Sequence, residues 1–247
     1  MKENKISRRS FLKFGAAASA AGMMAAAPVA ASAAQPDAAA AEDEENGLLD
    51  LFQKPKYIFL FIGDGMGHAQ IQSARFYKDT VDNNGAVTEA DLSFTGFPTV
   101  GSVTTYDSTS FCPDSASTAT SIATGNKTYS GMINVDITGS TPFETIAEKL
   151  HKQKDWKIGI ISSVNLNHAT PAAFYAHQAS RNDYYEIGEE LVNSGFEYFA
   201  GGGLKKVTGP EEDKTSLYDL ATNAGYKVTY TQADAEAVTA ADGKVIL

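Results

Sequence analysis

Short apolar runs alternate with segments of helical periodicity along residues 55–247. Residues 57–62 form a continuous apolar run that ends in Gly63-Asp64-Gly65-Met66-Gly67, as expected of a buried strand followed by a tight loop. Similar runs predict further strands between the helical segments. We expect strands at 57–62, 100–105, 157–164, 198–200 and 227–230, and the start of another at 244–247.

The helical segments carry start and stop signals. Gly125 closes a segment of small residues at 114–124, and Thr170-Pro171 opens another as N-cap and first residue, positions that these residue types favour. We predict helices at 71–77, 114–124, 141–151, 171–178, 184–193 and 217–224. Strands that alternate with helices predict an α/β fold with a mostly parallel sheet. A functional site then lies beyond the carboxyl ends of the strands.

The N-terminal segment is a targeting signal rather than part of the fold. Residues 7–13 read Ser-Arg-Arg-Ser-Phe-Leu-Lys, and a stretch rich in Ala, Gly and Met follows, with a small-residue cleavage site near 31–33. This pattern indicates a twin-arginine signal peptide over 1–34, hence a periplasmic or secreted protein. A membrane anchor is the alternative, but the apolar stretch is weak and Pro28 interrupts it. Residues 35–54 are acidic and low in complexity, which predicts a linker.

Charge and cysteine content restrict the possible partners. Removal of residues 1–34 takes away five Lys/Arg and one Asp/Glu, so the net charge changes from −10 to −14. Such an acidic chain argues against nucleic acid as a partner and offers carboxylates to cations. Cys112 is the single cysteine, so an intrachain disulfide and a thiolate metal cluster are excluded. A small buried side chain is favoured over a reactive thiol.

Two side chains at predicted loops are candidates for chemistry. Asp64 lies between glycines, which would allow its carboxylate to bridge two hard cations; an Asp-Gly turn explains it equally well. Ser115 follows Asp114 at the start of a predicted helix. It is therefore a candidate nucleophile at a helix N-terminus that suits a phosphate, although capping statistics favour a structural role for either residue.

Three more candidates follow the strand predicted at 157–164. His168 and Thr170 come directly after it, and Arg181 lies 13 residues beyond His168. Taken alone, His168 is more often a hydrogen-bonded surface histidine than a ligand, and we interpret His177 as structural. Arg181 offers a guanidinium fork that matches two phosphate oxygens, with a surface ion pair as the alternative.

Three separated segments, at 58–67, 114–136 and 168–181, resemble the alkaline phosphatase family. The resemblance rests on Gly63-Asp64-Gly65-Met66-Gly67, on Asp114-Ser115-Ala116 with Thr124-Gly125-Asn126-Lys127-Thr128, and on Ala169-Thr170-Pro171-Ala172-Ala173. It covers nearly all of residues 55–247, in family order and at family spacing. It implies a three-layer αβα sandwich with a mostly parallel sheet.

The resemblance implies a phosphomonoesterase that uses two zinc ions and one magnesium ion. Ser115 would attack phosphorus in line and form a phosphoserine, with zinc rather than a histidine base activating its hydroxyl. Arg181 would clamp the phosphoryl oxygens, with Asp114 beside it on the substrate side. Asp64 would lie between one zinc and the magnesium. Thr170 would ligate magnesium, and His168 would shape the third metal site.

The sequence also departs from this family. The zinc pair of the family is held mainly by Asp and His residues from the second half of the domain, and no histidine follows His177 here. We therefore expect residues 55–247 to be a partial catalytic domain, homodimeric in its full-length form and without a stable membrane anchor. On its own the chain should have little or no activity. A metal- or phosphate-binding remnant without turnover is the alternative. The spacing of Cys112-Pro113-Asp114-Ser115 argues against a sulfatase.

Overall fold

The computed structural model describes residues 55–86, 88 and 92–247. The predicted signal peptide and acidic linker therefore lie outside the described residues, and both stay predictions. By its internal contacts the chain divides into one unit over Met1–Leu60 and a second over Phe61–Leu247. Every helix and strand named below belongs to the second unit. None of the helices described is long and apolar enough to cross a membrane.

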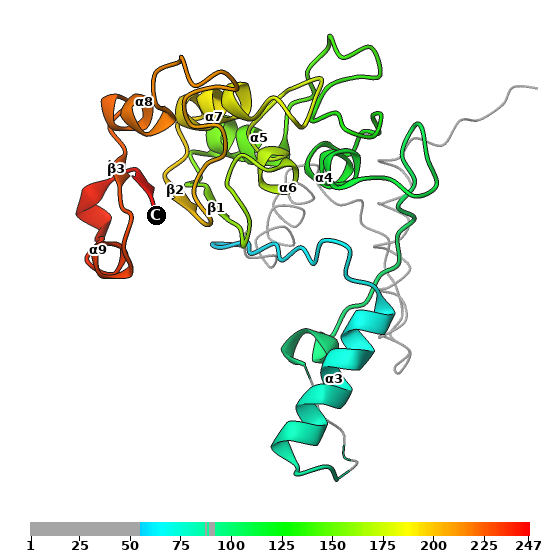
Figure 1. Cartoon of the computed structure of the whole chain (residues 1–247). Helices are drawn as coiled ribbons and strands as arrows, with labels where there is room; N and C mark the ends of the chain where they lie inside the picture. Colours follow the sequence, from blue (N-terminus) through cyan, green and yellow to red (C-terminus); the bar gives the residue numbers. More distant parts are fainter. Residues whose placement is uncertain (1–54, 87, 89–91) are drawn as a thin grey trace, which may run out of the picture. The chain divides into compact units, whose positions relative to one another are not determined.

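The second unit alternates helices with short strands, as the sequence predicts (Figure 1). The strands are β1 (Gly159–Ile161), β2 (Tyr198–Ala200), β3 (Lys227–Val228) and β4 (Val245–Ile246). The α-helices are α3 (His68–Asp82), α4 (Ser115–Thr124), α5 (Ile146–Lys154), α6 (Ala169–Ala172), α7 (Tyr184–Asn193), α8 (Leu217–Asn223) and α9 (Gln232–Glu236). Two 3₁₀ helices, η1 (Ser93–Gly96) and η2 (Ala240–Asp242), complete the elements of the described residues.

The four strands form one parallel sheet in the order β1-β2-β4-β3. Ile160, Phe199, Ile246 and Val228 lie side by side in its register. Paired residues of adjacent strands place their side chains on the same face of a sheet, and the first three are buried. This row is the sheet's contribution to the core, and the α/β class with a parallel sheet is confirmed.

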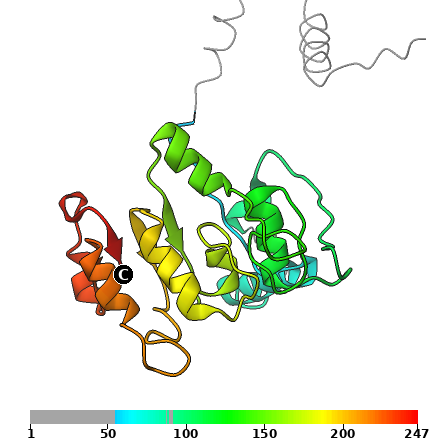
Figure 2. The same cartoon turned by 90° about the horizontal axis from the view of Figure 1, so that it is seen from above.

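Helices pack against this apolar row. Helices α7 and α8 lie side by side (Figures 1 and 2), and α7 buries Ile187 and Leu191 at helical spacing. Gly188 in α7 lets Leu217 of α8 approach, since a Cβ there would stand 2.3 Å from a Leu217 methyl carbon. The core continues to α4 and α6, which are also in contact.

The predictions of helices and strands succeed where local signals are strong. The predictions at 184–193 and 198–200 match α7 and β2, and the helix at 114–124 is α4 with Asp114 as its N-cap. Two predicted starts are wrong. The helix expected from Thr141 begins at Ile146, because Thr145 and Glu148 form a capping box there. The helix expected at 171–178 runs only over Ala169–Ala172, with His168 as N-cap.

Two predicted strands are absent from the described part of the chain. Residues 57–62 and 100–105 carry no strand pairing, and their apolar side chains are exposed, Phe61 by 86% and Val100 by 88%. A strand is stable only when neighbouring strands satisfy its backbone hydrogen bonds, and an apolar run alone does not supply them. Cys112 is exposed as well, so its predicted burial is wrong.

Candidate active site

The N-terminus of α4 presents Ser115 at its first position. The Asp114 side chain accepts a hydrogen bond from the Ser117 amide at 3.0 Å and caps the helix. At the other end Gly125 adopts φ 75°, the left-handed conformation that glycine tolerates. The cap predicted for Asp114 is therefore present. It holds the Ser115 hydroxyl at the positive end of the helix dipole.

Asp64 brings Ser115 and Thr170 together. The Ser115 hydroxyl donates to Asp64 Oδ2 at 2.8 Å, and the Thr170 hydroxyl donates to the same oxygen at 3.1 Å. The three residues come from a glycine-rich loop, from α4 and from α6, more than fifty residues apart in sequence. Asp64 is exposed, while Ser115 and Thr170 are half-buried. The oxygen atoms of these three side chains thus converge on an accessible point.

Arg181 is tied to the cap of the same helix. Its Nη1 lies 2.8 Å from Asp114 Oδ2, and both side chains are about a quarter exposed. Burial on its own raises the pKa of Asp114, but hydrogen bonds from the Ser117 backbone and the Arg181 side chain outweigh it, so the pKa lies below its usual value. Asp114 is therefore an anion that holds the guanidinium near Ser115. We call Asp64, Ser115, Thr170 and Arg181 the Ser115 site.

His168 lies beside this site. Burial lowers the pKa of its imidazole, and the positive charges of Arg181 and Lys205 lower it further, while Asp64 acts in the opposite direction. The ring is therefore held neutral, the form that can bind a metal ion. Its Nδ1 atom is buried without a hydrogen-bond partner, which costs free energy unless a ligand satisfies it.

One buried carboxylate near α4, Asp107, is not among the predicted residues. It is 5% exposed and accepts hydrogen bonds from Ser117 Oγ at 2.6 Å and Ser130 Oγ at 2.5 Å. Burial alone would raise the pKa of Asp107, but these bonds and those from Thr109 hold it well below its usual range. The partners are far apart in sequence, so no local pattern could have revealed them.

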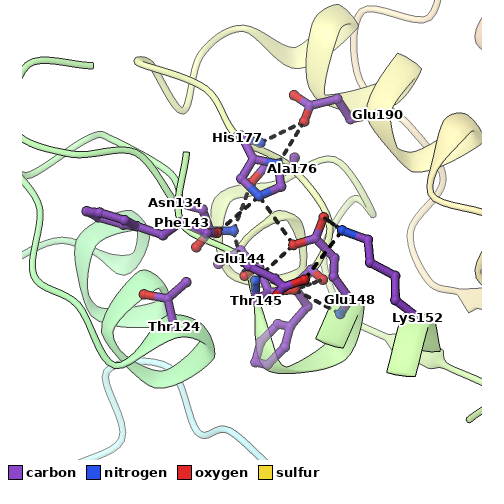
Figure 3. Close-up of polar contacts among 12 residues, drawn as sticks. Thr124, Asn134, Phe143, Glu144, Thr145, Glu148, Lys152, Ala176, His177 and Glu190 are labelled. Atoms are coloured by element: carbon purple, nitrogen blue, oxygen red, sulfur yellow. Dashed lines mark hydrogen bonds and ion pairs between the residues drawn. The ribbon is translucent and has the colours of Figure 1, made fainter. Parts of the chain in front are cut away.

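His177 has the structural role expected of it (Figure 3). Its two ring nitrogens lie 3.3 Å from Glu148 and 3.3 Å from Glu190. Burial lowers the pKa of His177, but the two carboxylates outweigh it and raise the pKa to about 9. The pKa of Glu148 is lowered to about 2, against the effect of burial, by His177 and Thr145. We call His177, Glu148 and Glu190 the His177 cluster.

The donors at the Ser115 site suit one class of metal ion. Mg²⁺ takes oxygen ligands and is commonly held by one or two carboxylates together with waters, so Asp64 with the Thr170 hydroxyl fits it. Zinc favours about four ligands drawn from nitrogen, sulfur and carboxylate. Among the residues described, no three His, Cys, Asp or Glu side chains are grouped so as to hold a metal ion. A zinc pair is therefore not formed by these residues.

Comparison with known proteins agrees with this arrangement. The family model for alkaline phosphatase matches residues 55–223. The chain belongs to the alkaline phosphatase family. The matched region contains every residue of the Ser115 site, and the resemblance inferred from the three motifs is confirmed.

Several alkaline phosphatases are similar to the chain. Alkaline phosphatase 4 of Drosophila melanogaster is 32% identical over 195 residues, which are 69% of this chain and 33% of that protein. A cold-active alkaline phosphatase from a psychrophilic Shewanella sp. matches with a TM-score of 0.62 and 31% identity, over 75% of this chain and 44% of that one.

A third match is a mutant of the alkaline phosphatase from the Antarctic bacterium TAB5, described with Mg bound in its M3 site. It has a TM-score of 0.59 and 26% identity, over 75% of this chain and 50% of that one. The chain thus spans a third to a half of the length of these relatives. The α/β fold of alkaline phosphatases is shared across the matched part.

Proposed function

We propose that the chain acts on phosphomonoesters through a phosphoserine formed on Ser115. One observation carries this proposal. The Ser115 hydroxyl lies at the N-terminus of α4 and donates a hydrogen bond to Asp64 Oδ2 at 2.8 Å, while Asp114 in the same cap holds Arg181. A nucleophile, an anion-binding helix end and a guanidinium therefore face one region.

The proposed chemistry has two steps. The Ser115 proton is directed at Asp64 Oδ2, so Oγ attacks phosphorus as its proton passes to that carboxylate. The ester P–O bond breaks, and the departing oxygen takes up this proton and leaves as the alcohol. Water then attacks the phosphoserine, the P–Oγ bond breaks to release inorganic phosphate, and one proton of the water returns to Ser115 Oγ. Arg181 and the helix N-terminus stabilise the negative charge on the phosphoryl oxygens during both steps.

A magnesium ion held by Asp64 and Thr170, with His168 beside it, would add positive charge to the site and fix the Asp64 carboxylate. From family membership we also propose that Asp64 contacts a zinc ion and that Ser115 is a zinc ligand. Since the described residues do not gather a zinc site, the two proposed steps do not involve zinc. We expect turnover by this chain to be slow for the same reason.

The same observation favours a second candidate function, a metal- or phosphate-binding protein without turnover. Assay of the full chain with p-nitrophenyl phosphate, Mg²⁺ and Zn²⁺ distinguishes the two. Hydrolysis that falls at least about a thousandfold in Ser115→Ala supports the enzyme, with Ser121→Ala in the same helix as the matched control. If the chain binds inorganic phosphate but does not hydrolyse the ester, the result supports the binding protein and contradicts the enzyme.

We further propose that residues 1–34 direct export through the twin-arginine route and that the protein forms a homodimer. The export proposal rests on the Arg8-Arg9 pair. Fractionation of cells that express the double variant Arg8→Lys, Arg9→Lys should find the protein in the cytoplasm. Unchanged export would contradict the proposal. Size-exclusion chromatography with light scattering tests the dimer.

A further inference from the structure

Asp107 is a buried anion whose hydrogen-bonding capacity is fully used. Oδ1 accepts from the Thr109 amide at 2.7 Å, the Thr109 hydroxyl at 2.8 Å and the Ser110 amide at 2.7 Å. Oδ2 accepts from Ser117 and Ser130. Five neutral donors thus surround one carboxylate, and no positive charge is among them. Burying an anion in this way costs free energy, which suggests that the position of the carboxylate matters.

The two oxygens have different tasks. The donors to Oδ1 all lie within three residues of Asp107, so that oxygen closes its own turn. The donors to Oδ2 lie 10 and 23 residues away. Oδ2 therefore joins α4 to the loop that contains Ser130.

Both ends of this bridge lead to the Ser115 site. Ser117 is completely buried, and its amide donates to the cap residue Asp114, which binds Arg181. On the other side, Ser130 precedes Gly131, whose carbonyl accepts a hydrogen bond from the Arg181 amide at 2.7 Å. The side chain and the backbone of Arg181 are thus held by the two segments that Asp107 connects.

We propose that Asp107 is a positioning residue that fixes the Ser115 end of α4 relative to Arg181. The coupling follows from the hydrogen bonds alone, and its effect on catalysis rests on the proposed function. When Arg181 binds a phosphoryl group, the hydrogen bonds of Asp107 to Ser117 and Ser130 keep Ser115 Oγ in line with phosphorus. A misplacement of about 1 Å at such a nucleophile can lower the rate a hundredfold.

The substitution Asp107→Asn tests this bridge with little change of shape. With its oxygen on the Thr109 and Ser110 amides, the new amide nitrogen would face Ser117 and Ser130 and donate to both hydroxyls. The Ser117 proton would then turn toward Asp114 Oδ1, which lies 3.1 Å from Ser117 Oγ. This hydrogen bond would compete with the one that Asp114 Oδ1 accepts from the Ser117 amide. Asp114 would then be less well oriented to bind Arg181.

Asp136→Asn is the matched control. Asp136 also closes a turn, since it accepts hydrogen bonds from Thr138 and from the Ser140 and Thr141 amides, but none of these donors belongs to α4 or to the Ser115 site. Ser130→Ala removes only one arm of the bridge and serves if Asp107→Asn does not fold. All variants are made in the full chain.

The first measurement is amide hydrogen exchange by NMR at Ser117 and Arg181, with Tyr198 in β2 as the reference. We expect Asp107→Asn to speed exchange about tenfold at both site amides and not at Tyr198. Ser130→Ala should speed it at Arg181 alone, and Asp136→Asn at neither. Unchanged exchange at Arg181, or an equal rise at Tyr198, would overturn the coupling.

The second measurement is steady-state hydrolysis of p-nitrophenyl phosphate. We expect Asp107→Asn to lower kcat about tenfold with KM changed less than twofold, because binding through Arg181 is kept while alignment is lost. A raised KM with unchanged kcat would overturn the catalytic part. If the unaltered chain shows no turnover, the proposed function fails on its own, and the exchange result still decides the coupling.

Discussion

The Ser115 site and the His177 cluster use carboxylates in opposite ways. In the His177 cluster a protonated imidazole lies between two glutamates, 3.3 Å from each, so its positive charge is paired with carboxylates within the protein. At the Ser115 site Asp64 Oδ2 accepts hydrogen bonds from two neutral hydroxyls. These hydroxyls orient the carboxylate without cancelling its charge.

This difference separates structural from chemical use of the same residue type. An ion-paired and mostly buried cluster has its interactions satisfied within the fold, and the raised pKa of His177 means that its protonated form contributes to stability. An exposed carboxylate with hydroxyl partners keeps lone pairs for a cation, since a carboxylate accepts about four hydrogen bonds or ligands. Substitutions should therefore affect ligand binding at the Ser115 site and stability at the His177 cluster.

The largest expected effect is on phosphate binding. Arg181→Ala should weaken binding of inorganic phosphate about a hundredfold, roughly 3 kcal/mol, because it removes the guanidinium and leaves Asp114 unpaired. Isothermal titration calorimetry measures this. Lys214→Ala, which removes an exposed ion pair with Glu186, should change the affinity less than twofold. If the two variants weakened phosphate binding equally, Arg181 would contribute no more to phosphate binding than a surface lysine does.

The next effect is on stability and its pH dependence. His177 has its pKa raised to about 9 from 6.5, so its contribution to stability is fully present below pH 6.5 and is lost as the pH rises through 9. His177→Gln should lower the free energy of unfolding by about 2 kcal/mol at pH 6 and by much less above pH 9. Urea denaturation across this range measures it.

The control for that experiment is Lys214→Gln, because its ion pair with Glu186 raises the pKa of Lys214 above 10.5, outside this range. It should leave the slope of stability between pH 6.5 and 9 as it is in the unaltered chain. A slope that persists in His177→Gln would mean that other groups titrate there. The two regions would then not differ in the way described.

The smallest effect concerns the metal. Thr170→Val keeps the shape of the side chain but removes the oxygen that converges on Asp64, and it should weaken Mg²⁺ binding about tenfold in calorimetry, roughly 1.4 kcal/mol. Thr170→Ser keeps the oxygen and should bind within twofold of the unaltered chain. If Val and Ser behave alike, Thr170 is not a ligand.

Local signals explain which elements could be predicted from the sequence. The apolar spacing of 184–193 specifies α7, and Asp114 with Gly125 marks the two ends of α4. The start of α5 was also readable, because Thr145 and Glu148 are spaced as a capping box. Of the two helix-start signals, this capping box rather than Thr141-Pro142 fixes the start of α5.

Long-range interactions explain what could not be predicted. Residues 57–62 have the composition of a buried strand, but strand formation depends on partners that no local window contains. The motifs named Asp64, Ser115 and Thr170 as separate candidates, whereas their meeting at Asp64 Oδ2 comes from the fold. Asp107 carried no signal, because Ser117 and Ser130 reach it only after the chain folds.

The central claim is that Ser115 receives the phosphoryl group. The direct test is to incubate the full chain with a phosphomonoester and Mg²⁺ and Zn²⁺, quench it, and map phosphorylated residues by mass spectrometry. We predict phosphate on Ser115 and its loss in Ser115→Ala, with Ser121→Ala still labelled. Ester hydrolysis without phosphate on Ser115, or labelling that survives Ser115→Ala, would contradict the account.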